Sequence, residues 1–141
     1  MIRVLTILFL VPLFIQHVVY AEELPDIEVF DIQNEEVVQT IPNSDELQSY
    51  VAGYVETIDG VCTMINPIPR EGFMIKTLFP SPLHVTNQWI DDQIETVIII
   101  LPTSDEPYLL MLNGEGRPYV FSFNADIQDF LDKIDFDPYN Q

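Results

Sequence analysis

The sequence predicts an α+β fold: an antiparallel meander of four to five strands, with an N-terminal and a C-terminal amphipathic helix packed on one face. Two observations lead to this prediction. Apolar residues recur at helical spacing near both ends of the chain, whereas the middle holds short apolar runs separated by turn residues. Links this short favour antiparallel pairing of consecutive strands, because parallel pairing needs a long crossover.

The first predicted helix begins at Asn43 or Ser44, either of which can cap it, and stops at Gly60. Its apolar stripe consists of Leu47, Tyr50, Val51, Tyr54, Val55 and Ile58. The second predicted helix is capped by Asn124 or Asp126. Its stripe is shorter and consists of Ile127, Phe130, Leu131 and Ile134.

The predicted strands lie between the two helices. Turn residues bound each of them, and "NGEGRP" is the clearest hairpin signal because Asn-Gly supplies the positive φ angles of a tight turn. "INPIPREGF" is predicted to be a loop, since its prolines forbid regular structure. The strands cover residues 73–79, 83–89 (after a Pro-Ser-Pro interruption), 95–101, 108–112 and 119–123.

Residues 1–21 are predicted to be a signal peptide, with a short positive start, an apolar run and cleavage after Ala21. The apolar run is shorter than the ~20 residues that span a bilayer, and a retained signal-anchor is the alternative. Residues 22–42 then form an acidic segment with short strands, residues 43–137 a single α+β domain, and residues 138–141 a tail. We therefore expect a protein that is secreted or on the cell-envelope exterior, with no membrane span after cleavage.

Charge is the strongest bulk property of the chain. It has 23 acidic residues against five basic ones, a formal net charge of −18. This field repels nucleic acid and anionic membrane or wall polymers, and it favours cationic partners or divalent ions. The simplest interpretation is that the charge keeps a secreted protein soluble.

Cys62 is the only cysteine, and His84 is the only histidine after the predicted signal peptide. A thiol with an imidazole is the minimum of a cysteine hydrolase, and Asn87 is a candidate to orient the ring. However, Cys62 is expected just after a helix C-terminus, where the helix dipole and the neighbouring Glu56 and Asp59 disfavour a thiolate. We therefore predict a partly buried apolar role, with a hydrolase or an intermolecular disulfide as alternatives.

Carboxylates recur along the second predicted helix, at Asp126, Asp129 and Asp132, with Asp135 and Asp137 beyond. Their spacing matches no calcium loop, and no glycine allows the chain to wrap around an ion. We predict a solvated acidic helix face, with no metal site and no cofactor.

Two proline-rich loops, "INPIPREGF" and "FPSPLH", flank the predicted strand 73–79. Recognition residues concentrate on loops that a rigid scaffold holds. These loops and the strand between them hold three of the few groups that can carry positive charge. The candidate binding residues are Pro67, Pro69, Arg70, Lys76 and His84. Simple stiffening of the connections by proline is the alternative.

The segments "INPIPREGFMIK", "VTNQWIDDQIETVIIILP" and "EPYLLMLNGEGRPYVFSF", within residues 65–123, resemble small uncharacterised exported proteins of Bacillus-type Gram-positive bacteria. The resemblance implies a secreted protein with no assigned activity, and it carries over no catalytic or ligand-binding residue.

These observations predict a non-enzymatic binding or interaction domain whose partner is a protein, a peptide or a wall component. The alternative function is a cysteine-dependent hydrolase that uses Cys62 and His84.

Overall fold

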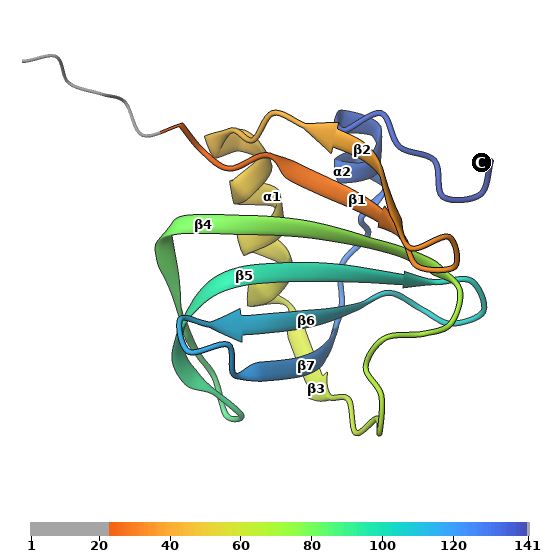
Figure 1. Ribbon diagram of the computed structural model, residues 1–141. Coiled ribbons are helices and arrows are strands. Elements are labelled where there is room, and N and C mark those ends of the chain that lie inside the picture. The colour runs from red at the N-terminus through yellow and green to blue at the C-terminus, as the bar shows by residue number, and fades with distance from the viewer. Residues whose placement is uncertain (1–22, 141) are drawn as a thin grey trace, which may run out of the picture.

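A computed structural model describes residues 23–140 (Figure 1). Seven strands form one sheet, in the order β2-β1-β4-β5-β6-β7-β3, and all neighbouring strands pair antiparallel. The strands are β1 (Ile27–Asp31), β2 (Glu36–Ile41), β3 (Ile58–Val61), β4 (Gly72–Thr86), β5 (Asp91–Pro102), β6 (Tyr108–Asn113) and β7 (Pro118–Phe123). The two helices are α1 (Asp45–Glu56) and α2 (Gln128–Lys133).

The α+β class and the antiparallel sheet are confirmed, whereas the predicted count of four to five strands is wrong. Strands β4 to β7 form the expected meander. Three further strands extend it, because β1 and β2 add to the edge at β4 and β3 adds to the edge at β7. Strand β1 lies between β2 and β4, so the acidic N-terminal segment contributes to the same sheet. The predicted signal peptide lies outside the described residues.

Strand β4 is one continuous strand of 15 residues, where the sequence predicted two strands separated by Pro-Ser-Pro. Its pairing with β5 shifts register between Leu78 and Leu83, and Pro80 and Pro82 fall in this irregularity. Proline lacks the N–H that a regular ladder needs, and a register break is one of the few places where a paired strand accepts it.

Helix α1 ends at Glu56, earlier than the predicted stop at Gly60. Its N-cap is Ser44, whose side chain accepts a hydrogen bond from the Leu47 backbone N–H at 3.2 Å. Gly60 instead lies in β3, opposite Ser122 of β7. The apolar stripe located the helix correctly, but it continued into a strand too short to show its own alternation.

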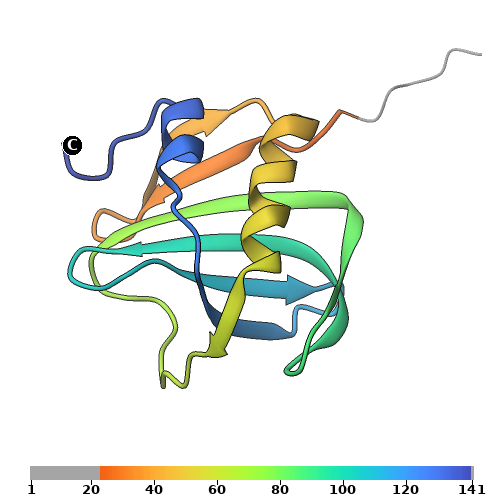
Figure 2. The same ribbon diagram turned by 180° about the vertical axis from the view of Figure 1, so that it is seen from behind.

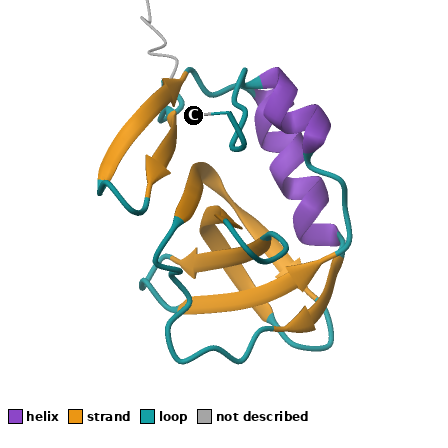
Figure 3. Ribbon diagram, turned by 90° about the vertical axis from the view of Figure 1, so that its right-hand side faces the viewer, coloured by secondary structure: helices purple, strands orange, loops and turns teal. Residues whose placement is uncertain are grey.

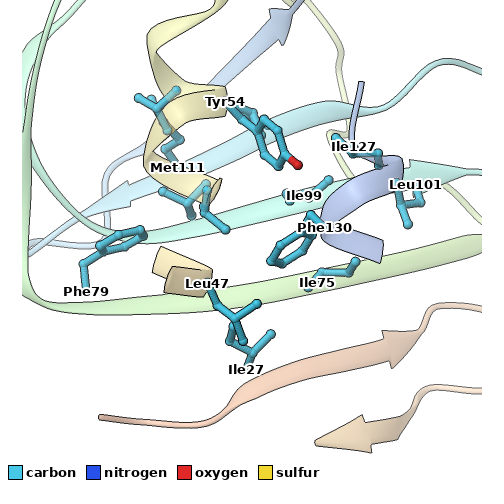
Figure 4. Packing of buried hydrophobic residues seen from close by; sticks show 14 of the residues in the cluster. Ile27, Leu47, Tyr54, Ile75, Phe79, Ile99, Leu101, Met111, Ile127 and Phe130 are labelled. Carbon is cyan, nitrogen blue, oxygen red and sulfur yellow. The ribbon is translucent and has the colours of Figure 1, made fainter. Parts of the chain in front are cut away.

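Both helices pack on the same side of the sheet, as the rear and side views show (Figures 2 and 3). The core between them is drawn in Figure 4, where Phe130 of α2 points toward the sheet beside Tyr54 of α1. Phe130 is fully buried, and its ring centroid lies 6.1 Å from that of Tyr54 in an edge-on arrangement. The strand residues of this core are Ile27, Val29, Ile75, Val97, Ile99, Leu109, Met111 and Phe121, among others.

Two glycines have positive φ angles, which other residues adopt only with strain. The β6–β7 hairpin is confirmed, but its positive φ falls at Gly116 (76°) and not at the Asn113–Gly114 pair. Gly72, at the start of β4, has a φ of 122°, and a Cβ there would lie 2.1 Å from the Leu101 carbonyl oxygen. Only glycine therefore allows β4 and β5 to approach at this end of their hairpin.

The core contains a hydroxyl group that makes no hydrogen bond within residues 23–140. Thr77 is fully buried on the helix side of β4, and its Oγ1 atom has no partner. A buried polar group without a partner costs free energy that an apolar isostere avoids.

Thr77→Val is therefore expected to stabilise the protein by about 1 kcal/mol, which raises Tm by about 4 °C. The measurement is thermal unfolding followed by circular dichroism. Thr57→Val is the matched control, because the Thr57 hydroxyl donates to the Tyr54 carbonyl oxygen at 2.8 Å and its loss should lower Tm. A lower Tm for Thr77→Val would show that the hydroxyl is satisfied in solution.

Candidate functional site

The structure does not gather the three predicted cationic groups into one patch. Arg70 precedes β4, Lys76 lies in its first half and His84 lies near its far end, along a strand of 15 residues. The Lys76 ammonium group is 3.5 Å from a carboxylate oxygen of Glu28, so its charge is already paired.

His84 belongs to a small exposed polar cluster. Its Nε2 atom lies 2.7 Å from Asp91 Oδ1 and 3.1 Å from the Thr86 hydroxyl, which also donates to Asp91 Oδ1. The hydrogen bond with His84 is the main reason why the pKa of Asp91 lies below its ordinary value. Both partners contact the same ring nitrogen, whereas a base that activates a hydroxyl uses one nitrogen for the nucleophile and the other for the orienting carboxylate.

Cys62 and His84 line different cavities. His84 lies beside a cavity of about 200 Å³ between the end of α1 and β4, which also includes Glu56. Cys62 lines a second cavity of about 610 Å³ at the other end of β4. The structure therefore does not form the thiol–imidazole pair that a cysteine hydrolase needs.

We call the second cavity the acidic pocket. It lies beside the antiparallel pair β3–β7, between the loop that follows β3 and the loop that joins β5 to β6. Both loops lie at the same end of the sheet (Figure 1). Its lining combines carboxylates with apolar and aromatic side chains and contains no lysine, arginine or histidine. The lining residues are Asp59, Cys62, Met64, Asn66, Pro69, Pro102, Asp105, Glu106, Pro107, Tyr108, Ser122 and Phe123.

The proline-rich loop after β3 is held in place as one wall of this pocket. The Tyr108 hydroxyl donates to the Pro67 carbonyl oxygen at 2.7 Å, which ties the loop to the start of β6. Within the loop, the Asn66 side chain accepts a hydrogen bond from the Ile68 backbone N–H at 3.1 Å and fixes a turn. Met64 and Ile68 are more than 40% exposed, so the loop presents apolar side chains to solvent.

The carboxylates of the pocket form no ion pair among the described residues. Asp59 accepts a hydrogen bond from the Ser122 hydroxyl at 2.7 Å, while Asp105 and Glu106 form neither a hydrogen bond nor an ion pair within residues 23–140. Arg70 lines an adjoining hollow with Asp105 but makes no ion pair with it. The pocket is therefore a site of concentrated negative potential.

The sequence predicted a binding role for the proline-rich loop after β3 but not for the carboxylates of the acidic pocket. Asp105 and Glu106 looked like ordinary turn residues, and Asp59 is more than 40 positions away from them. Only the pairing of β3 with β7 brings these residues to one cavity. The one available signal was Tyr108, an aromatic residue directly after the acidic turn.

Among the described residues, neither a metal site nor a helix that could span a membrane is found. Within residues 23–140, no three histidine, cysteine, aspartate or glutamate side chains converge in a way that would hold a metal ion. Neither α1 nor α2 has the length and the apolar run needed to cross a membrane.

Comparisons with known proteins give no family for the chain. No protein-family model matches it, and neither a curated protein nor a solved structure is significantly similar to it. The resemblance to exported Bacillus-type proteins stays a prediction.

Cys62 follows β3 and not the end of a helix, so the predicted dipole effect on its thiol does not apply. Partial burial raises the pKa of the thiol above its ordinary value, and the Asp59 carboxylate adds to the rise. Both causes favour the neutral thiol.

The rate at which iodoacetamide alkylates Cys62 is therefore expected to rise with pH. The pH at the midpoint of this rise should lie above the midpoint for N-acetylcysteine. Asp59→Asn should lower this midpoint, because it removes one of the two causes and keeps the hydrogen bond from Ser122 possible. A midpoint below that of N-acetylcysteine would show an activated thiolate and contradict this account.

Proposed function

We propose that the protein is a non-enzymatic binding domain that holds a cationic peptide segment in the acidic pocket. The observation that carries the proposal is the composition of the pocket: three carboxylates, Asp59, Asp105 and Glu106, on a cavity with aromatic and proline walls and no basic lining residue. Two of these carboxylates make no hydrogen bond or ion pair within residues 23–140.

A lysine or arginine side chain suits such a cavity better than a small inorganic cation does. Its methylene stem packs against apolar walls while its charged head reaches a carboxylate. The half-buried Phe123 adds an aromatic side chain to the lining, and a cation is stabilised over an aromatic ring face. A volume of about 610 Å³ lies within the range of ordinary ligand sites and accepts more than one side chain.

The charge of the whole chain supports the same partner class. A net charge of −18 attracts cationic molecules over a distance and accelerates their encounter with the surface. Of the predicted partners, anionic wall polymers are repelled by this field, whereas a basic protein or peptide is attracted. Export through the predicted signal peptide would place that partner outside the cell.

The positions and the chemistry of Cys62 and His84, the two groups that the hydrolase alternative needs, argue for a non-enzymatic role. The Cys62 thiol has a raised pKa, and His84 lies beside a different cavity with its Nε2 atom engaged by Asp91 and Thr86. We therefore propose recognition without covalent chemistry.

The test is fluorescence anisotropy with a labelled cationic peptide, acetyl-Lys-Lys-Arg-Gly-Ser-Thr-Ser-amide. The double variant Asp105→Asn/Glu106→Gln should weaken its binding at least fivefold, since each pairing at a partly exposed site contributes up to about 1 kcal/mol. Added salt should weaken binding to the unaltered protein, because exposed charge pairs are screened.

The matched control is Glu36→Gln/Glu115→Gln, which removes the same charge from residues that do not line the pocket. Glu36 lies on the edge strand β2, and Glu115 lies in the β6–β7 turn, at the opposite end of the sheet from Asp105 (Figure 1). This control should change binding less than twofold. Equal weakening by both double variants would mean that the peptide follows the overall charge, and it would overturn the proposal.

A further inference from the structure

The sheet has a second apolar face, which we call the outward face because it is turned away from α1 and α2. Alternation along the strands places Ile100, Tyr108 and Leu110 there as a buried cluster, with Met74, Ile98 and Val120 partly buried around it. Within residues 23–140 this cluster is made by strands β4 to β7 and Cys62 and by no helix, whereas both helices contribute to the core cluster on the other face. Figure 1 looks onto the outward face, with α1 behind the sheet.

The cluster forms a strip that runs across the strands. The strand pairing aligns Lys76 with Ile98, Ile98 with Leu110, and Leu110 with Val120. At one end, Lys76 pairs with Glu28, so the only opposed charges on this row neutralise each other. Leu110 is buried, and the half-buried Ile98 and Val120 on either side of it are the part of the strip that solvent reaches, an apolar and locally neutral surface on a strongly acidic chain.

The strip continues into the acidic pocket. Tyr108 and Cys62 belong to the apolar cluster and also line the pocket, so no polar barrier separates the two. Val120 lies beside Cys62, because its carbonyl oxygen accepts the Cys62 backbone N–H at 3.0 Å. Two strand spacings, about 10 Å, separate Val120 from Ile98, a length that about three residues of an extended peptide cover.

We infer that this strip binds the apolar end of the same peptide segment whose basic end enters the acidic pocket. The partner segment then has basic residues followed within about four positions by aliphatic ones. The inference rests on the proposed function. Charge complementarity selects this occupant over a second copy of the chain, since a second copy would bring another acidic pocket and a net charge of −18 toward the first.

The test compares two labelled peptides of the same length and charge. One is the cationic peptide acetyl-Lys-Lys-Arg-Gly-Ser-Thr-Ser-amide, and the other replaces its last three residues with Leu-Ile-Val. The aliphatic version should bind about tenfold more tightly, because it covers apolar surface of the strip. Ile98→Thr/Val120→Thr should abolish this difference and leave the affinity for the polar version unchanged.

Val37→Thr/Val38→Thr is the matched control, since these valines are 49% and 41% exposed on the edge strand β2, away from the strip. It should leave the tenfold preference intact. Equal affinities of the two peptides, both reduced by Asp105→Asn/Glu106→Gln, would overturn the inference and keep the proposed function. Failure of both peptides to bind would overturn both.

Light scattering tests the other occupant of the strip. A monomer at all concentrations supports the inference. A dimer that Ile98→Thr/Val120→Thr dissociates would identify a second copy as the occupant and overturn it.

Discussion

Strands β4 and β5 pair from Gly72 opposite Pro102 to Thr86 opposite Asp91, and the other elements are attached to this long hairpin. On the β4 side β1 and β2 extend the sheet, and on the β5 side β6, β7 and β3 follow. Because successive side chains point to opposite faces, one set meets the helices and the other forms the outward face. The apolar second half of β5, residues 97–102, supplies both sets.

The same hairpin determines where the acidic pocket lies. The loop before β4 and the loop after β5 both leave its end at Gly72 and Pro102, so they stand beside each other. The hydrogen bond from Tyr108 to Pro67 joins them, and the pairing of β3 with β7 brings in Asp59. The carboxylates there form no ion pair, because the four lysine and arginine residues that the structure describes lie outside the lining. Like charges that form no ion pair repel one another and do not stabilise the fold, and for this reason we propose a binding role for them.

The sequence predicted what local patterns encode. The stripe of α1 and its Ser44 cap, and the β6–β7 hairpin, depend on residues close together in the chain. It missed β3, whose four residues include Gly60 and carry no alternation of their own, and the continuity of β4 through Pro80. It also missed the grouping of Asp59 with Asp105, because distant strand pairing has no local signal. Among the predicted binding residues, Pro69 lines the pocket and Pro67 anchors its wall, whereas Lys76 and His84 lie elsewhere.

The most direct test of the acidic pocket is a titration of the ¹⁵N-labelled protein with the cationic peptide, followed by amide chemical shifts. Binding in the pocket predicts saturable shifts concentrated in residues 59–69, 105–108 and 122–123. Amides around His84 and in β2 should stay unchanged. Shifts centred on the His84 cavity, or spread evenly over the acidic surface without saturation, would contradict the account.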